Sequence, residues 1–371
     1  MSEQRTPMAH VRESLKVAWY RCPIPPDRLR ELTRRSDAQG ALQTIGFLAL
    51  VVALGLVTWH LYRQRLWGWM ALALFAYGTV FSFTPGPHEL LHGTVFRTKW
   101  LNGLFHRIYC MIQWHNPHEY KRSHTYHHVY TLHPEGDREV VLPITPSLHP
   151  LRILELLTFD VTAFWIVLSR TVTLAFTGRF HNEWSGAVFA DDATARRLAV
   201  RWARLQLLFH ALVIAASIVL RLWLLPVLVT IGQYVANLWM YLVLMPMHTG
   251  LRSNVTDFRK CVRSITLDPF TEFLYWHMNW HTEHHMYAAI PCYNLKRMSR
   301  AIAADMPRPR TLIGAWVEMR ATYQRQKRDP TFEFDTPVPP PRAKAPDPKD
   351  PLRSAIGDLA PKGLEGVGRS A

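Results

Sequence analysis

Residues 44–60 read TIGFLALVVALGLVTWH, and residues 66–84 read LWGWMALALFAYGTVFSFT. Each run approaches the roughly 20 apolar residues that cross the hydrocarbon core of a bilayer. Because the short linker Arg63-Gln64-Arg65 joins them, the sequence predicts a hairpin of two transmembrane helices over about 43–61 and 66–84. The mean hydropathy of -0.05 does not oppose this, because long polar segments elsewhere lower the average.

A second pair of apolar runs covers about 204–220 and 222–247, separated by Arg221. The expected fold class is therefore all-α, an integral membrane protein with four transmembrane helices in two hairpins and a cytosolic helical cap. Residues 151–176 are also long enough to cross, but three charged residues interrupt them: Glu155, Asp160 and Arg170. A charge near the bilayer centre costs about 2.5 to 3.5 kcal/mol, so an amphipathic helix in the membrane plane is expected there instead.

The formal net charge of +15 raises the possibility of a nucleic-acid partner. The basic residues argue against it, because they gather beside the predicted spans, where positive charge retains loops on the cytosolic side. They are Arg28, Arg30, Arg34 and Arg35 before the first span and Arg196, Arg197, Arg201 and Arg204 before the third. We expect a multi-pass protein of the bacterial inner membrane or an equivalent membrane, with both termini cytoplasmic.

The chain divides into four expected segments. Residues 1–40 form a cytosolic or interfacial segment, 41–295 the membrane domain, 296–330 a cytosolic helical segment, and 331–371 a Pro-rich tail predicted to be disordered. The four cysteines show no CxxC spacing, so they encode neither a zinc ribbon nor an iron–sulfur site. Free thiols on a reducing side of the membrane are expected.

Three histidine-rich strings carry the chemistry: HELLH (residues 88–92), HTYHH (124–128) and HTEHH (281–285). On a helix, positions i, i+3 and i+4 share one face, so each string aims its imidazoles in one direction. If Thr84 and Pro85 begin a helix, the first pair lies just outside the bilayer. The isolated His248, at the end of the fourth predicted span, is a ninth candidate ligand. The candidate metal ligands are His88, His92, His124, His127, His128, His248, His281, His284 and His285.

Imidazole binds zinc, copper, iron and nickel, but this many histidines exceed the needs of one ion and suggest two. A pair of irons held only by nitrogen keeps positions open for dioxygen, which can then attack an unreactive C–H bond. The surrounding membrane favours a lipid or acyl substrate that enters through an apolar tunnel. Trp114, Tyr275 and Trp276 either line this tunnel or anchor the protein at the interface. Glu89, Asn279 and Glu283 are candidates to orient the imidazoles, although Glu283 fits a surface position equally well.

The strings HELLHGTVFRTKWLN, KRSHTYHHVYTLHPEGDRE and WHMNWHTEHHMYAAIPCYNL resemble the three histidine boxes of the membrane fatty acid desaturase superfamily, from about Phe83 to Leu295. The resemblance implies a di-iron centre on the cytosolic side of a four-span domain, held by the eight box histidines. His248 is similar in placement to a further histidine of some members, whose asparagine four residues earlier is Leu244 here. The short HxxxH spacing of the first box occurs in several branches and does not select the reaction.

The leading interpretation is a desaturase that introduces a double bond into a fatty acyl lipid with dioxygen and two electrons. The chain has no HPGG-type haem segment, GxGxxG fingerprint or cysteine cluster, so the electrons are expected from a separate ferredoxin or cytochrome b5 with its reductase. One alternative is a lipid or alkyl hydroxylase or ketolase of the same superfamily. Another is a zinc-dependent membrane hydrolase or a metal-binding or transport protein. The sequence pattern does not indicate the chain length or headgroup of the substrate, the regiochemistry of the reaction or the oligomeric state of the protein.

The remaining histidines have weaker patterns. Histidines without a partner at helical spacing are expected at the surface or interface, and these are His10, His60, His149, His181 and His210. Those that flank the second box either support the ligands or face headgroups, and these are His106, His115, His118 and His133. His277 is expected to support the third box or to lie at the surface.

Overall fold

The computed structural model describes residues 7–140 and 145–341. Most of them lie in helices, as predicted. A small correction to the all-helical prediction is a parallel pair of two-residue strands, β1 (Ile265–Thr266) and β2 (Arg310–Thr311). All four cysteines are unpaired and buried, as expected from their scattered positions.

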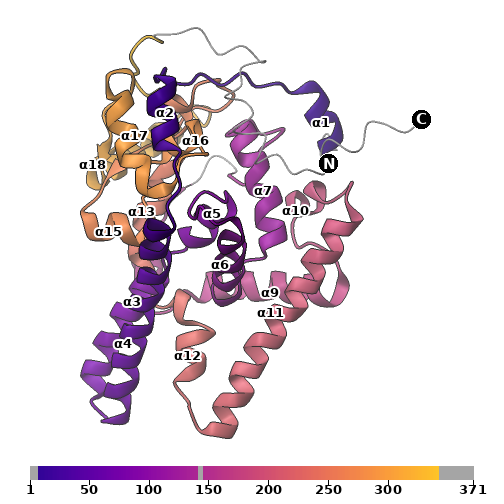
Figure 1. Cartoon of the computed structure of the whole chain (residues 1–371), viewed down its shortest axis with the longest axis vertical. Coiled ribbons are helices and arrows are strands. Elements are labelled where there is room, and N and C mark those ends of the chain that lie inside the picture. Colours follow the sequence, from indigo (N-terminus) through magenta and orange to yellow (C-terminus); the bar gives the residue numbers. More distant parts are fainter. Residues whose placement is uncertain (1–6, 141–144, 342–371) are drawn as a thin grey trace.

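The first predicted hairpin consists of α3 (Asp37–Arg63) and α4 (Trp67–Phe81), which lie side by side (Figure 1). The Ser36 side chain caps α3 by accepting a hydrogen bond from the backbone N–H of Gln39. Both helices expose large apolar side chains, such as Leu56 at 63% and Trp69 at 66%. Exposed apolar surface of this extent suits contact with lipid.

The second predicted hairpin differs from the expectation. Its first half is the continuous helix α11 (Ala193–Leu220), but 222–247 is broken into α12 (Leu225–Val229), η1 (Gly232–Tyr234), α13 (Leu238–Leu244) and η2 (Met245–Met247). Pro226 and Pro246 lack the backbone N–H of a continuous helix. Gly232 packs so closely that a Cβ there would lie 2.8 Å from the Tyr77 ring. Among the described residues, only α3 and α11 are long and apolar enough to cross a membrane, so four continuous spans are not confirmed.

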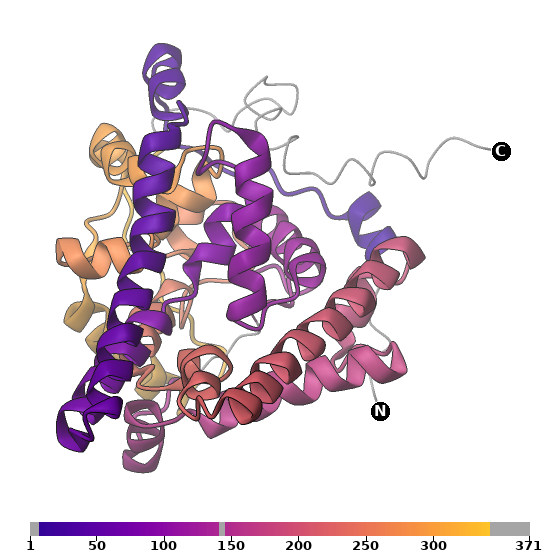
Figure 2. The same ribbon diagram turned by 60° about the horizontal axis from the view of Figure 1, so that its bottom comes forward.

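The stretch 151–176 forms two helices, α8 (Pro150–Leu157) and α9 (Val161–Thr177), rather than one. Asp160 breaks it: its carboxylate caps α9 by accepting from the backbone N–H of Ala163 and forms an ion pair with Arg152 at 2.7 Å. One of the three charges that argued against a span, Asp160, therefore lies at a helix junction, whereas Glu155 lies in α8 and Arg170 in α9. α9 then packs along α11, and Figure 2 shows the two helices side by side.

The remaining helices gather around and above the upper ends of α3 and α11, where the histidine strings lie (Figure 1). They are α1 (Met8–Ser14), α2 (Pro26–Leu32), α5 (Pro85–Leu91), α6 (Lys99–Ile112), α7 (Pro117–Tyr130), α10 (Glu183–Val188), α14 (Phe258–Cys261), α15 (Pro269–Leu274), α16 (His281–Met286), η3 (Cys292–Asn294), α17 (Leu295–Ile302), η4 (Ala303–Asp305) and α18 (Leu312–Gln326). The segment 296–330 is thus helical, but two prolines, Pro307 and Pro309, separate α17 from α18.

Residues 331–341, predicted to begin a disordered tail, make defined contacts with the loop that follows His248 and with α14. The backbone N–H of Phe334 donates to the Gly250 carbonyl at 2.7 Å, and Lys260 forms an ion pair with Asp335 at 2.8 Å. These contacts hold the segment against the helical cap. The rest of the predicted tail, 342–371, lies outside the described residues.

Candidate metal centre

Three short helices carry the three histidine strings into one buried region. α5 begins at Pro85, as the sequence predicts, and the Asn116 side chain caps α7 by accepting from two backbone N–H groups. α16 consists of the third string itself. All nine candidate histidines lie in two sets, within each of which the ligand nitrogens are within 4.8 Å of one another. The first set is His88, His92, His124, His128 and His284, and the second is His127, His248, His281 and His285.

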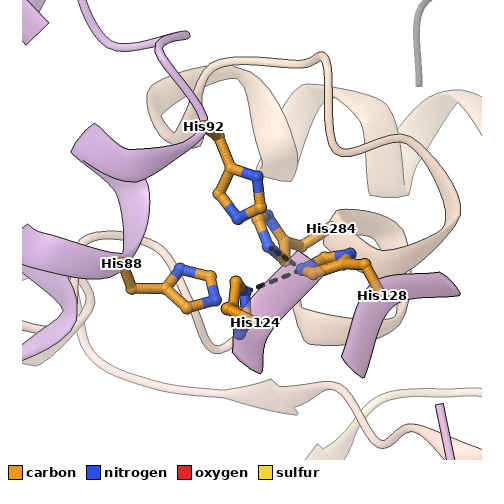
Figure 3. Close-up of side chains that lie close together, drawn as sticks. All are labelled: His88, His92, His124, His128 and His284. Atoms are coloured by element: carbon orange, nitrogen blue, oxygen red, sulfur yellow. Dashed lines mark hydrogen bonds between the residues drawn. The ribbon is translucent and has the colours of Figure 1, made fainter. Parts of the chain in front are cut away.

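The sets do not follow the three strings. The second string is divided, because His124 and His128 join the first set and His127 the second. Consecutive residues on a helix point about 100° apart, so the neighbours His127 and His128 reach different sets. Figure 3 shows the first set, in which rings from three separate helices converge on one small volume.

Distances between ring nitrogens fit two metal-binding sites. In the first set, Nε2 of His128 lies 2.9 Å from Nε2 of His124 and 3.2 Å from Nε2 of His284. In the second, Nε2 of His281 lies 3.0 Å from Nε2 of His248 and 3.2 Å from Nε2 of His285. Two imidazole nitrogens that bind one ion at about 2.1 Å and at right angles would lie about 3.0 Å apart. The nitrogens are therefore spaced as ligands of a shared ion.

Several ring nitrogens in the first set need a partner that the protein does not provide. Nε2 of His88 and both ring nitrogens of His92 are buried and make no hydrogen bond within the described residues. A buried polar atom without a partner is destabilising. A bound cation would satisfy the Nε2 atoms, so the residues present fit a metal.

Burial also keeps the ligands in the form that binds metal. It lowers the pKa of His92 and of His248 to about 3, and it lowers the pKa of His88 and His284 well below the usual range. Neutral imidazole is the ligand form of histidine. His127 differs: burial disfavours its charged form, but the nearby Asp137 carboxylate outweighs burial and raises its pKa.

Carboxylates orient three of the imidazoles through Nδ1. His88 pairs with Glu89, His124 with Glu139, and His127 with Asp137, each at 2.9 Å. Such a contact fixes the ring and leaves Nε2 free for a metal. Glu89 is one of the orienting residues expected from the sequence. Asp137 and Glu139 were missed, although both stand in the string GDRE shortly after the second box.

Neutral groups orient two histidines of the second set. Nδ1 of His285 lies 3.1 Å from the Thr131 hydroxyl, and Nδ1 of His248 lies 3.1 Å from the Cys261 carbonyl.

The other two expected orienting residues have different partners. The Ser264 hydroxyl donates to Glu283, and the Asn279 amide donates to the Ile265 carbonyl at 3.0 Å. These bonds connect the third string to the chain around β1 instead of orienting an imidazole.

Histidines outside the two sets follow the expectation with one exception. His10, His60, His149 and His181 are exposed. His210 is not: it is 2% exposed, and its ring stacks on Trp114 with centroids 4.0 Å apart.

The histidines that flank the boxes lie outside both sets. His106 and His133 are buried, whereas His115 and His118 are half-buried. His277, also half-buried, contacts the Glu272 carboxylate at 3.1 Å.

A cavity of about 1280 Å³ adjoins the first set. Polar residues form the wall nearest the histidines: Glu119, Tyr120, Ser123 and Glu139. The Tyr120 ring lies 5.5 Å from the His124 ring. Apolar residues from α8, α9 and α13 line part of the remainder, beside charged residues such as Asp160 and Arg170, and these apolar residues are Leu156, Ala163, Val167, Leu174, Met240 and Leu244. The cavity is thus partly polar, in contrast to the expected apolar tunnel.

The aromatic residues expected at the tunnel divide between two environments. Trp114 lines the cavity, and its indole N–H donates to the Thr230 carbonyl at 2.7 Å. Tyr275 and Trp276 are fully buried in the main hydrophobic core instead.

Fold and site together define a helical protein with membrane-length apolar helices and two adjacent, buried histidine sets, each suited to one metal ion. The family model of fatty acid desaturases matches residues 65–315, a range that includes both sets, and the chain belongs to this family. In the comparison with curated proteins, no match to the chain was found.

Proposed function

We propose that the protein is a membrane di-iron oxygenase that desaturates an alkyl chain, using dioxygen and two electrons from an external donor. The observation that carries this proposal is the division of nine histidines, eight buried and His128 half-buried, into two adjacent sets. A single structural zinc ion needs four ligands, so nine convergent imidazoles favour two ions. Imidazoles without thiolates suit iron that reacts with dioxygen.

In this proposal the five histidines of the first set hold one iron and the four of the second set hold the other. When bound, the irons would supply the activation of dioxygen. The protein contributes orientation and burial: Asp137 and Glu139 fix the tautomers of His127 and His124, so that Nε2 of each ring carries no proton. His284, 0% exposed, and His285, 3% exposed, lie away from water, which protects reactive species from side reactions.

The cavity beside the first set is the proposed substrate chamber. Its apolar wall, which includes Leu174 and Met240, suits an alkyl chain that enters from the lipid. Its polar wall at Glu119 and Tyr120 faces the part of the substrate nearest the histidines. A membrane lipid or acyl substrate, with polar groups as well as an alkyl chain, fits both walls.

Product analysis tests the proposed reaction. The purified protein, reconstituted with iron, an electron donor and lipid vesicles, should consume dioxygen and yield a lipid that has lost two hydrogens. A product that has gained an oxygen atom would assign a hydroxylase or ketolase instead. A protein that purifies with zinc and consumes no dioxygen would contradict the proposal.

The electron donor should be a separate acidic protein, such as a ferredoxin or a cytochrome of the b5 type. The chain carries a net charge of +15, and opposite charges accelerate the encounter of two proteins. Salt screens this attraction, so electron transfer should slow steeply as ionic strength rises. Stopped-flow measurement over a salt series checks this. A rate that does not change with salt would contradict an electrostatic interface.

A further inference from the structure

The segment between α1 and α2, at the top of Figure 1, contacts the ends of two histidine helices. The indole N–H of Trp19 donates to the Val129 carbonyl at 2.9 Å, near the end of α7. Two residues later, Nε of Arg21 donates to the Met286 carbonyl at 2.9 Å, at the end of α16. Val129 directly follows His128, and Met286 directly follows His285. The segment therefore contacts both helices immediately beside their metal-binding residues.

Both acceptors are groups that a helix cannot satisfy by itself. The last four carbonyls of an α-helix have no partner in the helix, and the carbonyls of Val129 and Met286 belong to this class. Trp19 and Arg21 thus complete the C-terminal ends of two helices that are distant in the sequence. Each contact stabilises its helix end, and together they connect the two ends.

Aromatic stacking connects the same segment to a ligand of the second set. The Trp19 ring stacks on Phe258, with centroids 4.0 Å apart and planes inclined by 12°. The Phe258 ring in turn lies 5.7 Å from the ring of His285. A displacement of Trp19 would therefore be transmitted through Phe258 to an imidazole.

The segment is itself held firmly. The backbone N–H of Tyr20 donates to the Thr256 carbonyl at 2.8 Å, and the Tyr20 hydroxyl donates to Asp305 at 2.6 Å. The Tyr287 hydroxyl donates to the Cys22 carbonyl at 2.8 Å. Trp19, Tyr20 and Cys22 are all buried. Residues 19–22 are thus a fixed part of the cap and not a loose N-terminal extension.

We propose that residues 19–22 act as a strap that sets the spacing of α7 and α16, with Trp19 and Arg21 as positioning residues for both metal sites. Each set takes histidines from both helices: the first from α7 at two positions and from His284, the second from His127 and from α16 at two positions. Metal–ligand distances tolerate errors of about 0.2 Å, so a small shift between the helices would disturb both sites. This inference rests on the proposed function, because it assumes that both sets hold metal.

Two conservative variants test the strap. Trp19→Phe keeps an aromatic ring on Phe258 but removes the N–H donor, and Arg21→Met keeps an unbranched side chain without the guanidinium. Matched controls are Trp165→Phe on α9, where the side chain is 66% exposed, and Arg30→Met, which is exposed on α2. Each protein is loaded with Co²⁺, its visible spectrum is recorded, and the release of the metal to a chelator is timed.

The strap variants should release Co²⁺ about tenfold faster than the wild type, the lower end of the effect of removing supporting residues around a metal. Their visible bands should shift, whereas both controls should match the wild type. If circular dichroism shows that Trp19→Phe does not fold, Arg21→Met alone tests the strap, because this substitution removes no aromatic ring from the core. Folded strap variants with wild-type release rates and spectra would overturn the proposal.

The Co²⁺ assay separates this inference from the proposed function, because it requires no turnover. The strap variants could release metal faster in a protein that consumes no dioxygen when loaded with iron. This result would support the strap and contradict the oxygenase. A protein that desaturates lipid, but whose strap variants release metal at the wild-type rate, would support the oxygenase and overturn the strap.

Discussion

The two histidine sets differ in how the protein holds their rings. In the second set, three of the four Nδ1 atoms contact a protein group: His127 contacts Asp137, His248 the Cys261 carbonyl, and His285 Thr131. Only the Nδ1 of His281 is buried there without a partner among the described residues. In the first set, His88 and His124 contact Glu89 and Glu139, but both nitrogens of His92 are buried and have no partner within the described residues. Protein groups therefore hold a larger share of the rings in the second set, and in the first set His92 depends most on a bound metal.

Replacement of a ligand should have the largest effect, and two neighbours on α7 allow a direct comparison. His128→Ala removes a ligand of the first set and His127→Ala a ligand of the second. Because both irons are needed in the proposed reaction, each variant should lose detectable desaturation. His127→Ala leaves three histidines in the second set and should lose about half of the bound iron, whereas His128→Ala leaves four in the first set and should hold its iron more weakly than the wild type.

Iron per chain, measured by plasma emission spectrometry, checks these variants. The exposed His10→Ala is the control and should retain full iron and activity. Full iron in His127→Ala, or iron in His128→Ala that a chelator removes no faster than from the wild type, would contradict the assignment of that histidine to its set.

Replacement of the carboxylates that orient the imidazoles should have the next largest effect. Loss of such a partner costs about 10- to 100-fold in metal affinity or activity. Asp137 is 2% exposed and also accepts from the Leu132 N–H, whereas Glu139 is half-buried. The loss caused by Asp137→Asn should therefore approach about 100-fold, and the loss caused by Glu139→Gln should be nearer to about tenfold. Steady-state turnover and iron affinity measure both, and the opposite order would contradict the role of burial.

A packing change beneath the first box should have a smaller effect, confined to the first set. A Cβ at Gly86 would lie 2.7 Å from the Tyr109 ring, so Gly86→Ala should displace His88. Such overpacking costs about 1 to 3 kcal/mol. Thermal unfolding and iron content measure the effect. Gly68→Ala is the control, because nothing lies within 4 Å of its Cβ, and equal behaviour of both variants would refute the close packing.

The smallest effect is expected at Thr131, whose hydroxyl is a neutral partner of His285. Thr131→Val should reduce activity by less than about tenfold, because a neutral hydroxyl holds the ring more weakly than a carboxylate does. The Thr131 hydroxyl also donates to the His127 carbonyl, four residues earlier, at 2.6 Å. Thr125→Val is a matched control, because the Thr125 hydroxyl donates to the Lys121 carbonyl in the same way but contacts no histidine of either set within the described residues. Equal turnover rates in the two variants would show that Thr131 does not support the second set.

The sequence pattern groups the nine candidate histidines but does not predict how they divide between two sets. Helical spacing identifies the histidines that share a face, and all nine lie in the two sets. Spacing cannot assign them, because one face of α7 is wide enough for His127 and His128 to point to different sets. Asp137 and Glu139 were missed because they lie in a loop, where no periodicity links them to the helix that they support.

The fold was predicted where apolar runs decide it and less well where packing does. The runs around Phe47 and Tyr77 form the expected hairpin. Hydropathy does not reveal that the backbone near Gly232 packs against α4, and it treats Pro226 and Pro246 as part of an apolar run. The region 222–247 therefore reads as a span although its helices are short and interrupted.

Anomalous X-ray diffraction at the iron absorption edge, from crystals of the iron-loaded protein, tests the central claim most directly. Two anomalous peaks per chain are expected, one among the five histidines of the first set and one among the four of the second. A single peak, or peaks outside these histidines, would contradict the account.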